Sequence, residues 1–190
     1  MNIIKSKNTF YTSDFHAGHS NIIKFCNRPW ATADEMNEGL IERWNEVVNP
    51  EDDVWHLGDF SFMNIEKTIE VMKRLNGNLR LVHGNHDQQI RNQAPRLLKE
   101  GLIKEHHEYK EIKISNKTIC LFHYRIAGHN KCHYGSWHLH GHHHSKLPPY
   151  GKSVDVGIDS QWILPEIPYR PFHYEEIKAV LDQQPILVHH

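Results

Sequence analysis

The chain has 190 residues, enough for one domain with a sizeable core and too few for two large ones. Its formal net charge is -1 with histidines neutral, so it lacks the basic excess typical of nucleic-acid-binding proteins, although a local basic patch is compatible with that total. We predict one domain over residues 1–190, with His189 and His190 set aside because such an end could derive from a tag.

Histidine is the one unusual feature of the composition, with 18 in the chain. It is the commonest metal ligand and titrates near neutral pH. Cys26, Cys120 and Cys132 are scattered, which gives neither an even disulfide framework nor the paired spacing of a zinc site. The first ten residues do not resemble a signal peptide, and no apolar run approaches transmembrane length. We therefore expect a cytoplasmic protein with reduced thiols and no membrane contact.

In chain order, a β-rich run over residues 9–13 comes first and stops at Asp14-Phe15-His16. Alternation along a strand would place Asp14 and His16 on one face and Phe15 on the other. Residues 20–31 predict an irregular segment. A capping box at residues 32–35 then begins a helix whose apolar side chains recur at helical spacing until Asn49-Pro50 ends it.

A second strand is predicted over residues 53–57, ending at Gly58-Asp59. A helix with an apolar stripe from Ile65 to Leu75 follows and ends at Asn76-Gly77, a typical helix C-terminus. The third strand, with Leu81-Val82, ends in a polar turn. Strands and helices that alternate in this way predict a largely parallel sheet, whose carboxyl ends bring polar side chains together.

The second half of the chain is richer in strands. Residues 88–101 predict a helical or irregular segment broken near Pro95. The remaining predictions are a hairpin of residues 111–115 and 118–122, a loop over 125–136, a histidine-rich run over 138–144, a strand over 153–158 and a last helix over 171–182.

The polar residues at the strand ends form a mixed oxygen and nitrogen set, too large for one four-coordinate ion. They suit two ions that share a bridging carboxylate, for which Asp59 is the isolated acid best placed. The donors suit manganese, iron, zinc or nickel. Spacing alone does not decide which two histidines of the run 138–144 are ligands, because His140 shares a strand face with His142 and His144. The candidates are Asp14, His16, Asp59, Asn85, His86, His123, His142 and His144.

Five short motifs occur in this order: Asp14-Phe15-His16, Gly58-Asp59, Gly84-Asn85-His86-Asp87, His123 and Gly141-His142-His143-His144. Together they resemble the five motifs of calcineurin-like metallophosphoesterases, over roughly residues 9–160. The tracts 13–23, 27–30 and 56–62 also resemble a small single-domain subgroup found in bacteria and phages. Arg125 departs from that subgroup, in which proline often follows the His-Tyr pair.

The resemblance implies an α/β fold, a four-layer αββα sandwich with a mixed β-sheet core and the metals at the strand ends. It implies that Asp14, His16, Asp59 and His144 hold one ion and that Asp59, Asn85, His123 and His142 hold the other, which settles the register. It also implies that His86 binds substrate phosphate as a general acid or electrostatic stabiliser, with Asp87 orienting it. Manganese is the metal we expect to support activity in vitro.

The function we predict is two-metal-dependent hydrolysis, by metal-activated water, of a small nucleotide-like phosphodiester. Arg28 and Arg125 are the expected phosphate-binding residues, and Arg28 could equally be a surface residue stacked on Trp30. Trp30, Tyr134 and Trp137 are candidates for stacking on a base.

Three other functions remain open: a phosphomonoesterase, a DNA nuclease and a non-catalytic, metal-bound protein-binding module. The near-neutral charge disfavours the nuclease, so nucleic acid is not the expected partner. Because His86 and all seven ligands are present, an enzyme is favoured over the binding module. The oligomeric state stays open.

Overall fold

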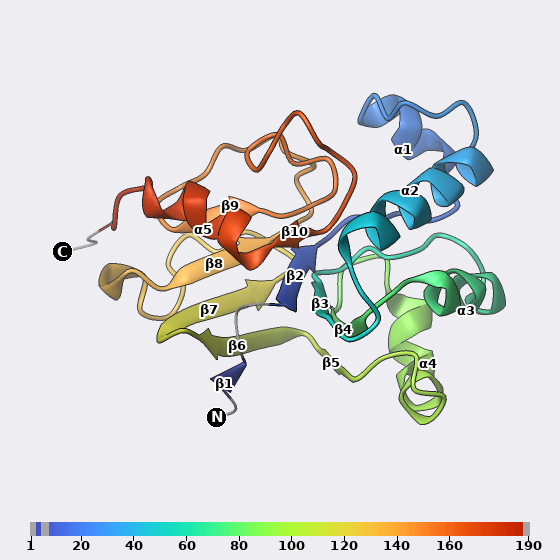
Figure 1. Cartoon of the computed structure of the whole chain (residues 1–190), viewed down its shortest axis with the longest axis horizontal. Coiled ribbons are helices and arrows are strands. Elements are labelled where there is room, and N and C mark those ends of the chain that lie inside the picture. The colour runs from blue at the N-terminus through green and yellow to red at the C-terminus, as the bar shows by residue number, and fades with distance from the viewer. Residues whose placement is uncertain (1–2, 5–7, 188–190) are drawn as a thin grey trace.

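The structure is a computed structural model that describes residues 3–4 and 8–187 (Figure 1). His189 and His190 lie outside the described residues. Two five-stranded sheets pack against each other, and helices flank them, which confirms the predicted fold class. No helix in the described part of the chain is long and apolar enough to cross a membrane.

The first sheet contains the three strands predicted in the first half of the chain. Four of its strands are parallel, as expected for alternating strands and helices, and a short fifth strand adds an antiparallel edge. In spatial order the strands are β10 (Phe172–His173), β2 (Thr9–Thr12), β3 (Asp53–His56), β4 (Asn78–Val82) and β5 (Glu105–His107).

Four helices cover the outer face of this sheet. Their apolar side chains form one core cluster with strand residues such as Val54 and Leu79. Trp44, one of the apolar side chains that recur at helical spacing after the predicted capping box, is fully buried there. The helices are α1 (Ser20–Phe25), α2 (Ala33–Val47), α3 (Ile65–Arg74) and α4 (Gln88–Lys99).

Two local predictions in this layer were wrong. The segment predicted irregular over residues 20–31 contains α1, a helix too short for a periodic pattern, which buries Ile22. Helix α4 runs through Pro95 without ending, because buried Ile90, Ala94 and Leu97 hold both halves against the core.

The capping box predicted at the start of α2 is half formed. The Glu35 N–H donates to Thr32 Oγ1 at 3.1 Å, as expected, but the Glu35 carboxylate accepts the Ala31 N–H at 3.0 Å. The side chain therefore satisfies a backbone donor one residue further from the helix.

The second sheet is mixed. The predicted hairpin is confirmed as an antiparallel pair. Its two-residue turn is Ser115-Asn116, both in the left-handed conformation, one residue earlier than the predicted strand bounds imply. The other neighbouring strands pair in parallel. The order is β1 (Ile3–Ile4), β6 (Tyr109–Ile114), β7 (Lys117–Phe122), β8 (Trp137–His140) and β9 (Ser153–Asp155).

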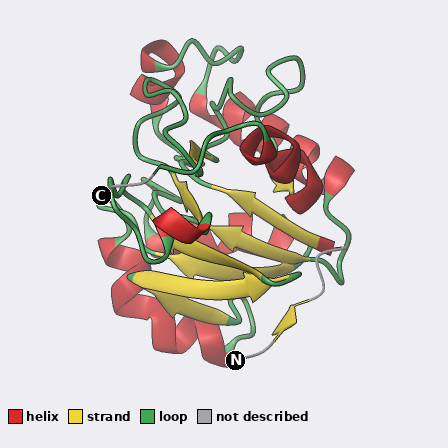
Figure 2. Cartoon of the chain, turned by 90° about the vertical axis from the view of Figure 1, so that its left-hand side faces the viewer, coloured by secondary structure: helices red, strands yellow, loops and turns green. Residues whose placement is uncertain are grey.

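The inner faces of the two sheets share a second core cluster, in which Tyr11 and Trp55 of the first sheet join Leu121 and Leu139 of the second. The last helix, α5 (Tyr174–Asp182), buries its apolar side chains in the same cluster. Figure 2 shows the loops gathered beyond one end of the strands. This packing brings the carboxyl ends of β2, β3, β4, β7 and β8 together.

Candidate metal centre

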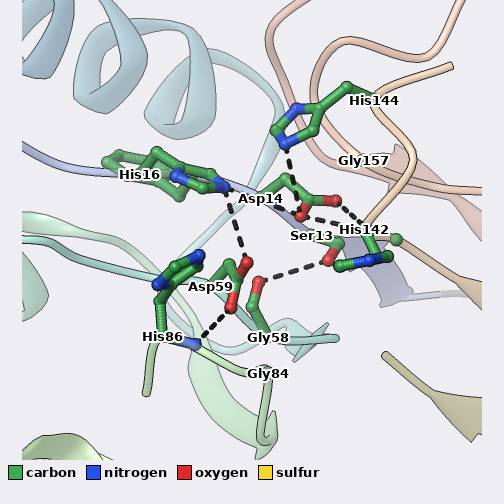
Figure 3. A network of polar contacts seen from close by, with 12 residues as sticks. Ser13, Asp14, His16, Gly58, Asp59, Gly84, His86, His142, His144 and Gly157 are labelled. Atoms are coloured by element: carbon green, nitrogen blue, oxygen red, sulfur yellow. Dashed lines mark hydrogen bonds and ion pairs between the residues drawn. The ribbon is translucent and has the colours of Figure 1, made fainter. Parts of the chain in front are cut away.

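The two sheets bring the predicted ligands together from opposite halves of the sequence (Figure 3). Six of the predicted ligands form two groups of three, in each of which the ligand atoms all lie within 4.8 Å of one another. The seventh predicted ligand, Asn85, places its Oδ1 3.0 Å from His123 Nε2, beside the second group. The first group is Asp14, His16 and His144, and the second is Asp59, His123 and His142.

Asp59 lies between the two groups. Its Oδ2 is 3.7 Å from His16 Nε2 in the first group and 3.4 Å from His123 Nε2 in the second. Its Oδ1 accepts the His86 N–H at 2.9 Å. A carboxylate oxygen in this position can serve two cations.

The ligand residues take a backbone conformation that non-glycine residues rarely adopt. Five of them have positive φ in the left-handed region, and such strain persists only where the surrounding structure imposes it. The prediction that strand alternation places Asp14 with His16, and His142 with His144, on one face was wrong. These residues lie beyond the strands, because β2 ends at Thr12 and β8 ends at His140. The φ angles are Asp14 59°, His16 55°, Asp59 58°, His142 70° and His144 46°.

Glycines allow the strand ends to approach closely. A Cβ on Gly84 would lie 2.2 Å from Asp59 Oδ1, and one on Gly141 would lie 2.3 Å from Asp14 Oδ2. Any side chain at either position would displace a carboxylate. The glycines of these motifs are therefore required by contact with Asp59 and Asp14.

The cluster has the electrostatics of a cation site. Burial alone would raise the pKa of Asp14, but His16, His144 and His123 hold it well below its usual range. Burial would lower the pKa of His123, but the Asp59 hydrogen bond and the Asp14 charge raise it to about 9. Burial would likewise lower the pKa of His144, but the Asp159 hydrogen bond and the Asp14 charge raise it to about 10. Protons on His123 and His144 therefore balance the negative charge of the carboxylates. Divalent cations would replace those protons.

Three of the candidate ligand histidines are oriented through their Nδ1 atoms, as is usual for histidines that bind metals. His123 Nδ1 lies 2.8 Å from the Leu57 carbonyl, and His16 Nδ1 lies 3.3 Å from His19 Nδ1. His144 Nδ1 lies 2.8 Å from Asp159 Oδ2. His16 Nε2 is buried and has no hydrogen-bond partner among the described residues. This unsatisfied atom, in a mixed carboxylate and imidazole set, fits a metal ligand.

Sequence reasoning missed Asp159, which follows β9 in a short loop. Its carboxylate receives the His144 contact and a two-pronged ion pair from Arg28, with Nε to Oδ1 at 2.9 Å and Nη2 to Oδ2 at 2.8 Å. An isolated Asp in a sequence carries no sign of such a partner 131 residues away.

Arg28 lies in neither predicted position. Its side chain is fully buried, and besides Asp159 it donates to the carbonyls of Asp14 and Phe15 at 2.8 and 3.0 Å. The side chain near Trp30 is Arg43, 5.7 Å from the ring centroid. With its donors directed at protein groups, Arg28 positions the turn that carries Asp14 and does not face the open side of the centre.

Asp159→Asn is expected to weaken metal binding about 10–100-fold. The asparagine side chain can still contact His144, but it lacks the negative charge that makes the imidazole a stronger ligand. The substitution also leaves Arg28 charged and buried without the carboxylate that balances its charge, which should lower the free energy of unfolding by about 3–5 kcal/mol. Titration with Mn²⁺ measures the first effect, and urea unfolding of the metal-free protein measures the second. Unchanged affinity and stability would contradict the role of Asp159.

Asp87 also differs from its prediction. Its buried carboxylate accepts the backbone N–H groups of Gly84 and Asp59 at 2.8 Å and of Phe60 at 2.9 Å. Burial raises its pKa, and these hydrogen bonds partly offset the rise. Asp87 thus ties two motif loops together, while the exposed His86 ring lies beside Phe62 and His16, with centroids 4.5 and 6.0 Å away.

The aromatic residues expected to stack on a base lie elsewhere. Trp137 is buried in the core between the sheets, and Trp30 packs against Tyr169. Tyr134 lines a hollow with Lys117, at the start of β7, whereas His123 follows the end of that six-residue strand. At ~3.3 Å per residue, the two ends are about 20 Å apart. Arg125 is half-buried, 5.1 Å from the Tyr150 ring centroid.

Comparisons with known proteins agree with this geometry. A family model described as a calcineurin-like phosphoesterase superfamily domain matches residues 10–154. An uncharacterized protein of Methanocaldococcus jannaschii is 30% identical over 183 residues, covering 92% of this chain and 91% of that protein. The gene 66 protein of Mycobacterium phage D29 is 28% identical over 179 residues, covering 80% and 88%. A solved structure from Aquifex aeolicus, of unknown function, has a TM-score of 0.66 at 22% identity, covering 91% and 98%.

Proposed function

Because the chain belongs to the calcineurin-like phosphoesterase superfamily, we propose that it is an enzyme, a two-metal-dependent phosphoesterase. The family expected from the five motifs is thereby confirmed. The observation that carries the proposal is the position of Asp59 Oδ2 between His16 and His123, one from each group of ligands. Two ions with a shared carboxylate are the arrangement that phosphate ester hydrolysis uses.

Each of the two groups of residues would hold one ion. Asp14, His16 and His144 would hold one ion, and Asn85, His123 and His142 the other, with Asp59 shared. When bound, such ions polarise the phosphoryl oxygens and lower the pKa of water, so that a nucleophile is available at neutral pH.

The chain itself supplies the remaining functions. His86 is exposed at the open side, so its imidazole can contact a phosphoryl group or donate a proton to the leaving oxygen. Its backbone N–H is held by Asp59, so the ring has a defined place relative to the metals. The buried Arg28 and Asp87 keep the turns that carry Asp14 and Asp59 in position.

We propose a small nucleotide-like phosphodiester as the substrate. The test is a panel of nucleotides, cyclic nucleotides and aryl phosphates, assayed with Mn²⁺, Fe²⁺, Zn²⁺ and Ni²⁺ and after chelation. Metal-dependent hydrolysis of diesters supports the proposal, and manganese is expected to be the best metal in vitro. A protein that binds two ions but hydrolyses no ester in the panel would contradict it.

Arg125→Ala is expected to raise KM for a nucleotide diester while leaving a simple aryl diester less affected. Arg125 forms no ion pair with any described residue, so its charge is available to a substrate. Its charge also reaches the centre: burial lowers the pKa of His143 most, and the Arg125 charge is the next largest cause. Steady-state kinetics on both esters measure the effect. Equal losses would place Arg125 in support of the metal centre, and no change on either ester would remove it from substrate binding.

A further inference from the structure

The solvent exposure of the candidate ligands indicates which side of the metal centre is open. Among its ligands, Asp14, His16, Asp59 and His123 are buried, whereas Asn85 is exposed, as is the neighbouring His86. Two large aromatic side chains are exposed on the same side, Phe62 at 39% and Tyr124 at 38%. Most other large aromatic residues of the described chain are packed in its two cores.

Phe62 borders the first group of ligands. Its ring centroid is 5.0 Å from that of His16, 4.0 Å from that of His19 and 4.5 Å from that of His86. Its N–H donates to the Ala17 carbonyl at 2.9 Å, which joins its turn to the loop after Asp14. The ring is therefore held in place although it faces solvent.

Tyr124 borders the second group. Its ring centroid is 4.7 Å from that of His142 and 5.0 Å from that of His123, at interplanar angles of 63° and 73°. Its ring neighbours Phe122, His123 and His142 all meet it at steep angles, so no parallel ring among the described residues covers its faces. Two residues further on, the Ile126 N–H donates to Nε2 of the buried His138 at 3.0 Å, which holds the backbone of this loop in place.

Two anchored aromatic rings thus stand on opposite sides of a centre that would hold a phosphoryl group. Small-molecule sites commonly combine apolar walls with a few polar groups that fix orientation. A ring already held in place loses little freedom when a ligand stacks on it. Phosphate charge alone would not require such walls, since the ions and His86 supply what it needs.

Resting on the proposed phosphoesterase function, we propose that Phe62 and Tyr124 are the specificity-determining walls of the substrate site. Their rings contact the planar base of a nucleoside that is esterified to the phosphate. The site then prefers nucleoside phosphoesters over phosphoesters of plain alkyl alcohols. Stacking of a base on an aromatic side chain accounts for about 5–150-fold in affinity.

The first test measures the binding of phosphate monoesters, which are not the diesters proposed as substrates. Calorimetry compares the binding of thymidine 5′-phosphate and of methyl phosphate to the Mn²⁺-loaded protein. The two ligands share the phosphate, and only the first carries a nucleoside. Thymidine 5′-phosphate should bind at least fivefold more tightly. Tyr124→Leu and Phe62→Leu should each lose most of that preference, whereas Tyr124→Phe and Phe62→Tyr should retain it because the ring is kept.

The second test uses the p-nitrophenyl diesters of thymidine 5′-phosphate and methyl phosphate, which share a leaving group. The leucine variants should lower the ratio of kcat/KM for the thymidine ester to that for the methyl ester, through KM. Tyr134→Leu is the matched control, an exposed tyrosine at the far end of β7 whose loss should leave the ratio unchanged.

The outcomes separate this inference from the proposed function. Tighter binding of thymidine 5′-phosphate that depends on the two rings, with neither ester hydrolysed, supports the walls and contradicts the phosphoesterase. Hydrolysis of both esters with equal kcat/KM, or equal losses on both esters in the leucine variants, supports the phosphoesterase and overturns the walls. Metal content and thermal unfolding of each variant confirm that the centre is intact.

Discussion

Asp59→Asn is expected to lose metal and activity together, with at least one of the two ions released and hydrolysis reduced by more than about 10²-fold. The substituted amide keeps the shape of the side chain and can still accept the His86 N–H, so the loop geometry should survive. What it loses is the negative charge between His16 and His123. Since two metal ions in the proposed centre would supply several kcal/mol of charge stabilisation, the loss of the ligand proposed to be shared should have a large effect.

Metal analysis by mass spectrometry of the purified variant, alongside steady-state kinetics, measures both effects. Asp52→Asn is the matched control, because Asp52 is also a buried carboxylate but accepts the Asn49 N–H at 2.8 Å beside the start of β3, away from the ligands. It should keep both ions and its activity. Two ions per chain with full activity in Asp59→Asn would remove Asp59 from the shared position.

His86→Ala is expected to keep the metals and lower turnover about 10²–10⁴-fold, the usual loss when an acid–base group is removed. The imidazole is exposed at the open side of the centre, and only its backbone N–H holds Asp59. Alanine keeps that N–H. The variant therefore separates substrate chemistry from metal binding, as Asp59→Asn does not.

The leaving group of the substrate identifies the role of His86. If the imidazole donates a proton, the loss in kcat should be greater for an alkyl leaving group than for p-nitrophenolate, which leaves without one. If it stabilises charge on the phosphoryl group, the two losses should be equal. Unchanged turnover of the alkyl substrate would rule out both roles.

Local chemistry in the sequence determined most of the elements and the ligand set. Apolar periodicity identified the helices α2 and α3, because each buries one continuous face. Short apolar runs identified the strands β2, β3 and β4, which the two cores bury on both faces. The five motifs indicated the residues that the structure gathers into two groups, since parallel strand ends must meet at one edge of a sheet. The choice of His142 over His140 came from the family motif, and the structure places His142 with Asp59 and His123.

Only the tertiary structure decided what surrounds these ligands. Arg28 and Asp159 are 131 residues apart, and nothing local marks them as partners. Asp87 follows His86 directly, yet its carboxylate points to backbone N–H groups of another loop. Trp30 and Trp137 are packed within the fold, and Phe62 and Tyr124 border the centre. Residue type specifies which chemistry a side chain can perform, but its direction depends on packing between distant segments, and local sequence does not contain that information.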